Sequence, residues 1–512
     1  ISFDEVEAGF SDSFIGLIEG GVDALLIETQ QDMLNMKAAV VGAHRALDEA
    51  GMDLPIFVQV TMEQTGTMLL GSELGAAVNF LECFPRIAGI GINCATGPEE
   101  MQPHVRFLSQ YSTRIISVMP NAGLPVMEGG VGVYKLSPEE LADFHRKFVE
   151  EFGVSIVGGC CGTTPEHIRA VASAIRGTTS ARRTPQKLIG CSSLYQFQPY
   201  DQSPSFLIVG EKTNANGSKA FRDALAAQDM DTLVEIARDQ EREGSHVLDV
   251  CTAYVGRDEI ADMESLLFQY AQQVTIPLMI DTTEWQVVEA ALKRVPGKAL
   301  INSIHFEDGG ERLQHVLSFV RKYGAAVVAL TIDEDGMAKS CERKVAIAER
   351  ILEMTRSYGL DDEDIFFDCL TFTLGSGDEE FRKAGIETLD AIRELKKRNP
   401  RVNTILGVSN ISFGLKPAAR HVLNSVFLHY AREAGLSSAI VHAGRIMPES
   451  RVEPEVWEIA RKLVFDERDE GCDPLIEFMA RFESVESTRS PESDMDLLSV
   501  EERLKRHIID GV

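Results

Sequence analysis

Short apolar runs alternate with amphipathic helical stretches through most of this chain, and this alternation constrains the fold more than any other feature. Between residues 206 and 447, eight such runs follow one another with helical sequence between them. They span residues 206–211, 246–251, 277–283, 299–304, 325–333, 364–370, 403–410 and 437–444. Apolar strands separated by helices are typical of parallel sheets that are covered on both faces. Eight strand–helix units predict a closed parallel barrel of the (β/α)8 TIM type.

The first 176 residues show the same alternation with fewer strands. Five apolar runs span residues 22–28, 56–62, 87–94, 115–121 and 154–161. Because a barrel of this type needs eight strands, we expect a first barrel over residues 1–176 that lacks its three N-terminal strands. The sequence begins with Ile-Ser-Phe inside an amphipathic helix and without an initiating methionine, so we expect the missing strands to precede residue 1.

Changes in composition mark the boundaries between these parts. Residues 177–205 are rich in Ser, Thr, Pro, Gln and Arg, which is typical of an interdomain linker. The second barrel is predicted over residues 206–447, and residues 448–512 are predicted to form a helical tail that leads into a further module. The predicted fold class is therefore α/β, with two TIM-type barrels in tandem followed by helices.

Charge and cysteine content exclude several classes of partner. The formal net charge of −29 disfavours binding to nucleic acid or to anionic lipid. No apolar run approaches the length of a membrane span. Nine cysteines in 512 residues do not make a disulfide framework, so we expect a protein of the reducing cytoplasm.

Three cysteines stand where predicted strands end. Cys94 is the last residue of the run 87–94. The adjacent Cys160 and Cys161 end the run 154–161, with two glycines before them and one after them. Thiolates suit zinc, and three protein ligands leave a fourth position open for a substrate. A substrate thiol bound there would be activated for alkylation. Two alternatives to a metal site remain: a strained disulfide between the adjacent Cys160 and Cys161, or burial of the cysteines as core residues.

The other cysteines have no partner at the spacing of metal ligands, so we expect them to be core residues. They are Cys83, Cys191, Cys251, Cys341, Cys369 and Cys472.

The second barrel carries polar residues at or near the ends of most of its predicted strands. These residues are Glu211, Asp249, Asp281, Asn302, Asp333, Asp368 and Asn410. Converging carboxylates and amides suit a flat heterocycle with alternating donors and acceptors, such as a pterin. Capping of the following helices is the alternative for each residue taken singly. The chain shows no Ser-His-Asp order, phosphate-binding loop or dinucleotide fingerprint.

Several short sequence motifs resemble those of the cobalamin-dependent methionine synthases. GINCATGPEE, PNAG and GGCCGTTPEH are similar to their homocysteine-binding domain. GEKTNANGSKAFRD, VLDV, IDTT, INSI and GVSNISFGL are similar to their pterin-binding domain. The order of the two domains also matches, so the resemblance covers essentially the whole chain.

The resemblance implies roles for residues of the first domain. Cys94, Cys160 and Cys161 would bind zinc, with the homocysteine thiolate as the fourth ligand. Glu28 would hold the substrate ammonium group, and Asn121 would lie near the amino acid.

For the second domain, the resemblance implies a ring of groups that bind 5-methyltetrahydrofolate. They are Glu211, Asn214, Asp249, Asp281, Asn302, Asp368, Asn410 and, as a weaker match, Arg420. Asn410 and Asp368 would act in catalysis, with Asn410 forming a hydrogen bond to the nitrogen that loses its methyl group.

The implied activity is methyl transfer from 5-methyltetrahydrofolate through cobalamin to zinc-activated homocysteine, which gives methionine and tetrahydrofolate. Cobalamin would be bound by a domain outside this sequence, fused downstream. The acidic, glycine-rich word that opens the first barrel in the family is missing here. Two alternatives remain: a folate-dependent corrinoid-protein methyltransferase with a separate corrinoid partner, and a non-catalytic folate-binding protein.

Overall fold

The computed structural model describes residues 1–468 and 473–482, and it divides into two compact units. The first unit comprises Ile1–Leu370, Ala391–Leu406 and Gly435–Gly444, and it holds both sheets discussed below. Within the described ranges, no helix is both long enough and apolar enough to cross a membrane.

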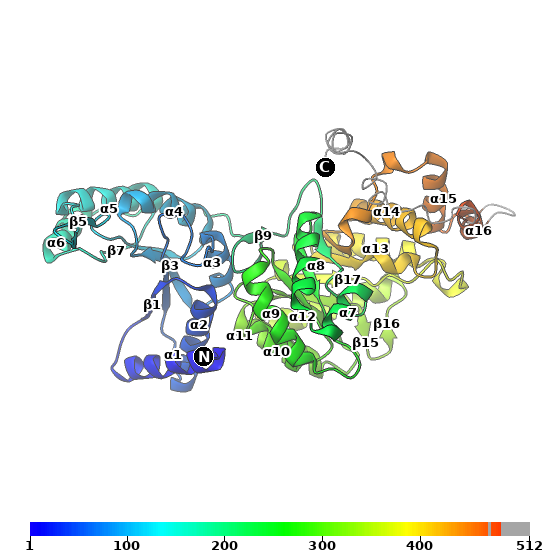
Figure 1. The fold of residues 1–512 in the computed structure, drawn as a ribbon, viewed down its shortest axis with the longest axis horizontal. Helices are drawn as coiled ribbons and strands as arrows, with labels where there is room; N and C mark the ends of the chain where they lie inside the picture. Colours follow the sequence, from blue (N-terminus) through cyan, green and yellow to red (C-terminus); the bar gives the residue numbers. More distant parts are fainter. Residues whose placement is uncertain (469–472, 483–512) are drawn as a thin grey trace. The chain divides into compact units, whose positions relative to one another are not determined.

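The N-terminal part of the first unit is built on a five-stranded parallel sheet (Figure 1). Its strand order is β1 (Leu25–Gln30), β2 (Ile56–Val60), β3 (Ile87–Asn93), β4 (Ile115–Met119) and β7 (Ile156–Val157). Helices α1 (Phe3–Glu19), α2 (Met33–Ala50), α3 (Leu74–Leu81), α4 (Pro98–Tyr111), α5 (Pro138–Phe152) and α6 (Pro165–Ile175) alternate with the strands. All five expected strands are present in one parallel sheet, which confirms the α/β prediction here, while closure into a barrel stays a prediction.

Local sequence signals explain where these helices begin and end. The α5 helix opens with a capping box, in which the Ser137 side chain accepts a hydrogen bond from Glu140 N and the Glu140 carboxylate accepts one from Ser137 N. It ends at Gly153, which has a φ of 70° that suits glycine. This helix leads into β7, so its ends help to place the strand that precedes the paired cysteines.

The segment predicted as a linker contains the antiparallel hairpin β8 (Gly190–Ser192) and β9 (Phe197–Pro199). Ser192 N donates to Lys298 O over 3.0 Å, and the Ser192 hydroxyl accepts from Lys298 N over 3.0 Å. Cys191 and Tyr200 belong to the same apolar cluster as Leu207 and other strand residues of the barrel. The hairpin is therefore packed into the barrel core.

The second sheet of the first unit is a closed parallel barrel of eight strands, as predicted (Figure 1). In order they are β10 (Leu207–Gly210), β11 (Val247–Val250), β12 (Leu278–Asp281), β13 (Leu300–Ile304), β14 (Ala326–Leu330), β17 (Ile365–Asp368), β18 (Asn403–Gly407) and β19 (Ser438–Val441). Pairing of Leu207 with Ser438 closes the ring between β10 and β19.

Helices follow the barrel strands in the expected alternation. They are α7 (Lys219–Ala227), α8 (Met230–Arg242), α9 (Glu259–Gln273), α10 (Trp285–Leu292), α11 (Glu311–Tyr323), α12 (Cys341–Ser357), α13 (Ala384–Arg398) and α14 (Pro417–Ala434). Of the cysteines expected in the core, Cys191, Cys251 and Cys369 are buried, Cys83 and Cys341 are half-buried, and Cys472 lies outside the described residues.

One predicted strand is wrong in its extent. The run 325–333 was expected to be a single strand, but β14 ends at Leu330. Ile332 and Asp333 instead form β15, which pairs antiparallel with β16 (Gly336–Met337). Asp333 forms an ion pair with Arg343, so its carboxylate links this hairpin to α12.

The second unit comprises Thr371–Asp390, Gly407–Ala434 and the C-terminal region from Arg445. It includes α14 and the tail helices α15 (Pro454–Val464) and α16 (Pro474–Arg481). His429 of α14 meets Trp457 of α15 edge to face, with ring centroids 5.3 Å apart. The predicted helical tail from residue 483 onward lies outside the described residues.

Replacing Gly91 with alanine should destabilise the sheet that carries the cysteines. A Cβ on Gly91 would lie 2.2 Å from Ser117 O on the neighbouring strand β4, where the backbone cannot yield easily. We expect Gly91→Ala to lower the free energy of unfolding by about 3 kcal/mol, as overpacking of cores does. Gly16→Ala is the control, because Gly16 lies in α1 with no atom within 4 Å of the added Cβ. Urea unfolding should show little loss for this control, and equal stability of the two variants would contradict the packing argument.

Candidate functional sites

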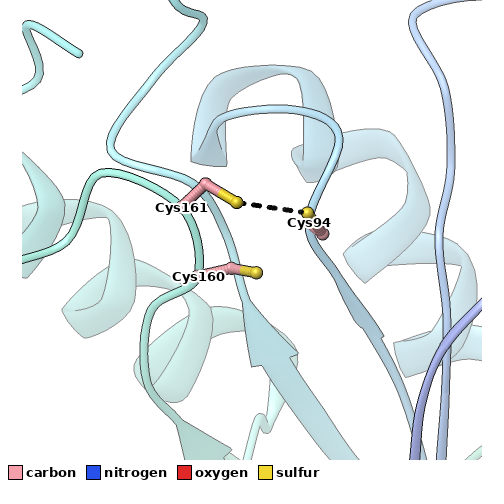
Figure 2. Close-up of side chains that lie close together, drawn as sticks. All are labelled: Cys94, Cys160 and Cys161. Carbon is pink, nitrogen blue, oxygen red and sulfur yellow. Dashed lines mark hydrogen bonds between the residues drawn. The ribbon is translucent and has the colours of Figure 1, made fainter. Parts of the chain in front are cut away.

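The three predicted cysteines converge at the carboxyl edge of the N-terminal sheet (Figure 2). Cys94 directly follows β3, and Cys160 and Cys161 lie in the loop after β7. Their sulfur atoms all lie within 4.8 Å of one another, and the Sγ atoms of Cys94 and Cys161 are 3.7 Å apart. In Figure 2 the three side chains point into one shared space from the two loops. This is a cluster of soft donors that could surround a single metal ion.

Backbone hydrogen bonds hold both loops against the end of β4. Cys94 N donates to Met119 O over 3.1 Å, and Cys160 N donates to Pro120 O over 2.8 Å. Cys94 itself has a φ of 63°, a conformation that few residues other than glycine adopt. The two cysteine loops are therefore fixed to the same intervening strand, which sets the distance between their sulfurs.

Asn121 holds the paired cysteines directly. Its side-chain Oδ1 accepts a hydrogen bond from Cys161 N over 3.0 Å, and the side chain is almost fully buried. The Thr163 hydroxyl donates to Cys160 O over 2.7 Å from the other side of the loop. The predicted contact of Asn121 with an amino-acid substrate stays a prediction, whereas its part in shaping the cysteine loop follows from these contacts.

The Cys160 thiol of this cluster is a poor acid in the absence of a cation. Burial, followed by the neighbouring Cys94 thiol, raises the pKa of Cys160 to about 12. A divalent ion offsets both effects, because its charge favours thiolates. Among the described residues the cluster consists of three sulfurs, and such soft donors fit zinc.

Two neighbours of the cysteine loop carry no signal in the local sequence. His145 of α5 is fully buried, and its Nε2 lies 2.8 Å from Gly158 O, two residues before Cys160. Burial lowers the pKa of His145 to about 4, so the ring is neutral and Nε2–H donates. The ring of Tyr134 covers Gly162, where a Cβ would lie 2.3 Å from the Tyr134 Cγ. Burial and the closeness of the three thiols raise the pKa of Tyr134.

Glu28 lies at the same edge of the sheet, near the end of β1, and its side chain is exposed. A buried asparagine ties this strand end to the cysteine loop: Asn93 Oδ1 accepts from Thr29 N over 3.0 Å, and Asn93 Nδ2 donates to Thr29 Oγ1 over 2.8 Å. Asn93 is the residue before Cys94. The structure thus places Glu28 on the edge that carries the sulfurs, and its role in binding an ammonium group stays a prediction.

Asn214, Asp249 and Asp281 form the centre of a second cluster at the carboxyl end of the barrel. The Asn214 Nδ2 donates to Asp249 Oδ2 and to Asp281 Oδ2, both over 2.8 Å. Its Oδ1 accepts from Asn216 N over 2.9 Å, which fixes the orientation of the amide. Within the described residues, Asp249 Oδ1 is buried and has no hydrogen-bond partner. One carboxylate oxygen is thus ready to accept a hydrogen bond from a ligand.

The two carboxylates of this cluster resist ionisation. Burial and the charge of Asp281 raise the pKa of Asp249 well above its ordinary value. Burial also raises the pKa of Asp281 to about 6, although the hydrogen bond from Asn214 opposes the shift. Buried, closely spaced carboxylates of this kind are more common at functional sites than elsewhere.

Three further predicted residues of the first unit end barrel strands or follow them. Glu211 comes directly after β10, and Asn302 lies in β13. Asp368 is the last residue of β17, and its Oδ1 accepts from Leu370 N over 2.8 Å. Parallel pairing puts all these strand ends on one side of the barrel, as the sequence predicted.

Asn410 and Arg420 belong to the second unit. Asn410 is exposed and lies in the short helix η3 (Val408–Ser412) that follows β18. Arg420 of α14 donates from Nη2 to Ser409 O and from Nε to Ser412 Oγ, both over 3.3 Å. Arg420 therefore supports the helix that carries Asn410, and folate contacts of either residue stay predictions.

Comparison with known proteins matches both sites to domain families. Residues 1–175 match the homocysteine S-methyltransferase family, and residues 210–442 match the pterin-binding enzymes. The chain is 50% identical to the methionine synthase of Mycobacterium tuberculosis over 99% of its length, and equally to that of Mycobacterium leprae. The chain is thus similar to the methionine synthases over nearly its whole length. The predicted resemblance is thereby confirmed.

The match covers nearly all of this chain but only 43% of each mycobacterial methionine synthase. Among solved structures, a dihydropteroate synthase from Clostridium difficile matches 46% of this chain and 90% of its own, with 22% identity and a TM-score of 0.36.

Replacing Asp281 with asparagine should stabilise the protein at pH 7.5. The folded-state pKa of Asp281 is about 6 against an ordinary 3.8, so its ionised form is disfavoured by folding at neutral pH. We expect Asp281→Asn to raise the free energy of unfolding by about 1–3 kcal/mol at pH 7.5. At pH 4 the folded protein carries a neutral Asp281, so the advantage of the variant should vanish.

Denaturant unfolding at the two pH values measures this difference. Asp223→Asn is the control, since Asp223 is exposed and forms an ion pair with Lys219 at 3.8 Å, where solvent weakens the interaction. A gain for Asp281→Asn that did not depend on pH would show that ionisation is not its cause.

Proposed function

We propose that this chain provides the two substrate sites of a folate-dependent homocysteine methyltransferase. The thiol site lies at the edge of the N-terminal sheet, and the folate site lies at the mouth of the barrel. The observation that carries the proposal is the convergence of three sulfurs within 4.8 Å of one another inside a region that matches the homocysteine S-methyltransferases. The reaction gives methionine and tetrahydrofolate.

At the thiol site, Cys94, Cys160 and Cys161 would hold zinc and leave one position for the sulfur of homocysteine. Zinc bound there supplies positive charge that lowers the pKa of the substrate thiol, so that the nucleophile exists at neutral pH. Asn121 and Thr163 keep the paired cysteines facing Cys94. Glu28, on the same edge, supplies a carboxylate for the substrate ammonium group.

At the folate site, the carboxylates accept hydrogen bonds from the pterin ring. Such a ring presents amino and amide N–H groups along one edge, and the open Asp249 Oδ1 and the Asp281 carboxylate are acceptors for them. Asn214 keeps these two carboxylates together without supplying a proton. Glu211, Asn302 and Asp368 complete the site from other strands.

A carrier must take the methyl group from the folate site to the thiol site. Cobalamin supplies that carrier in this proposal, bound by a domain outside the sequence and fused downstream. The reduced thiols and acidic surface suit the cytoplasm. The alternative with a separate corrinoid protein shares the folate half of the reaction and differs in the thiol half.

Zinc binding should depend on the three converging cysteines and on pH. We expect one zinc ion per chain for the wild type, and loss of most of the affinity in Cys94→Ser and Cys161→Ser. Cys83→Ser should bind zinc normally, because the Cys83 thiol lies elsewhere and its Sγ donates to Asn79 O. Since zinc must displace the proton of Cys160, whose pKa is raised, the affinity for zinc should increase as pH rises. Competition with a chromophoric chelator measures the affinity, and a wild type that binds no zinc would contradict the thiol half of the proposal.

The two half-reactions should fail independently in different variants. With free cob(I)alamin and 5-methyltetrahydrofolate as substrates, we expect Asp281→Asn to lose most of the methyl transfer and Cys161→Ser to retain it. With free methylcobalamin and homocysteine as substrates, the pattern should reverse. Visible absorbance of the corrinoid follows both reactions.

Each failure of this experiment has a separate meaning. Folate binding without any methyl transfer would favour the non-catalytic folate-binding protein. Activity in the folate half alone would favour the corrinoid-protein methyltransferase.

A further inference from the structure

Arg312, near the start of α11, binds backbone carbonyls at the ends of barrel strands. It is the second residue of this helix, and its guanidinium donates from Nε to Thr283 O and from Nη2 to Thr282 O, both over 2.6 Å. A third bond runs from Nη1 to Ser303 O. One side chain thus binds three backbone carbonyls at the ends of two adjacent strands.

These carbonyls flank two of the residues expected to bind the pterin. Thr282 and Thr283 directly follow Asp281, the last residue of β12, and Ser303 directly follows Asn302 in β13. Thr282 N also donates to Asn302 O over 3.1 Å, which joins the same two strand ends. The position of Asp281 relative to Asn302 is therefore set where Arg312 binds.

The arm that carries Arg312 is itself anchored. Asp308 accepts from Arg312 N over 2.8 Å and from Gly310 N over 2.9 Å. Gly309 and Gly310 have φ values of 74° and 95°, which only glycine adopts freely, and they turn the chain into α11. A planar guanidinium on a fixed arm presents its donors in a rigid fork, which an ammonium group does not.

The charge of Arg312 also acts on the carboxylate cluster. Its positive charge lowers the pKa of Asp281, against the larger effect of burial, which raises it. Arg312 supplies this charge while its donors are bound to backbone carbonyls.

We propose that Arg312 is a positioning residue of the folate site, which clamps the ends of β12 and β13 so that Asp281 and Asn302 face the pterin ring together. The ligand in this inference rests on the proposed function. Arg312 touches no substrate in this role and acts through the backbone of its neighbours.

Two substitutions separate the fork from the charge. Arg312→Met keeps the aliphatic stem and removes every donor, whereas Arg312→Lys keeps the charge but lacks the fork. We expect both variants to bind 5-methyltetrahydrofolate about tenfold more weakly than the wild type. The backbone carbonyls would lose their hydrogen-bond donors, and the strand ends would be held less firmly. Arg238→Met is the matched control, because Arg238 is also a helix arginine that donates to one backbone carbonyl, Gln273 O, away from the strand ends.

Hydrogen–deuterium exchange gives a readout that needs no ligand. Loss of the clamp should speed exchange of the amides in residues 281–284 and 302–304, with little change in Arg238→Met or in the barrel strands further away. Equilibrium binding of 5-methyltetrahydrofolate and the exchange rates are measured on the same full-length chains.

Each result decides a specific point. Full affinity in Arg312→Lys would show that charge alone is enough and would overturn the positioning role. Unchanged exchange and affinity in Arg312→Met would overturn it as well. If the wild type bound no folate, the proposed function would be wrong, and the exchange rates at residues 281–284 and 302–304 would still decide whether Arg312 clamps the strands.

Discussion

Parallel pairing of strands is the constraint on which both sites of this molecule depend. Neighbouring parallel strands end on the same edge of a sheet. Residues that follow these strands therefore meet there even when they are far apart in the sequence. Cys94 and Cys161 are 67 positions apart, yet their sulfurs lie 3.7 Å from each other because β3 and β7 both pair with β4. The same geometry assembles Asn214, Asp249 and Asp281 from successive barrel strands and loops.

Both clusters share an electrostatic property: each contains a group whose charged form is disfavoured when no ligand is bound. Burial and the neighbouring thiols raise the pKa of Cys160, and burial together with the charge of Asp281 raises the pKa of Asp249. A cation at the first cluster, or a donor-rich ring at the second, would supply the partner that each lacks. Sites of this kind lose stability in the free protein in exchange for binding energy, which is a common balance at functional sites.

Sequence reasoning found the parts of this arrangement that depend on local pattern. Period and polarity located the strand ends, and with them the three cysteines and the carboxylates. It failed at Asp333, because the apolar run continues past Leu330 and nothing in the run marks the change from barrel strand to hairpin. It also missed His145, Tyr134 and Arg312, whose contacts with Gly158, Gly162 and the ends of β12 and β13 arise only when helices and loops pack on the sheets. Such contacts depend on register and rotamer, which no spacing in the sequence records.

The hairpin of β8 and β9 has a practical consequence for anyone who wishes to study the folate barrel in isolation. Composition alone would start such a fragment near residue 206, where the first barrel strand begins. That cut would remove Cys191 and Tyr200 from the apolar cluster that they share with Leu207. It would also remove the two hydrogen bonds that Ser192 forms with the backbone of Lys298. A fragment of the barrel that keeps these contacts therefore has to begin before Gly190, because part of the stretch that looks like a linker in the sequence packs against the barrel.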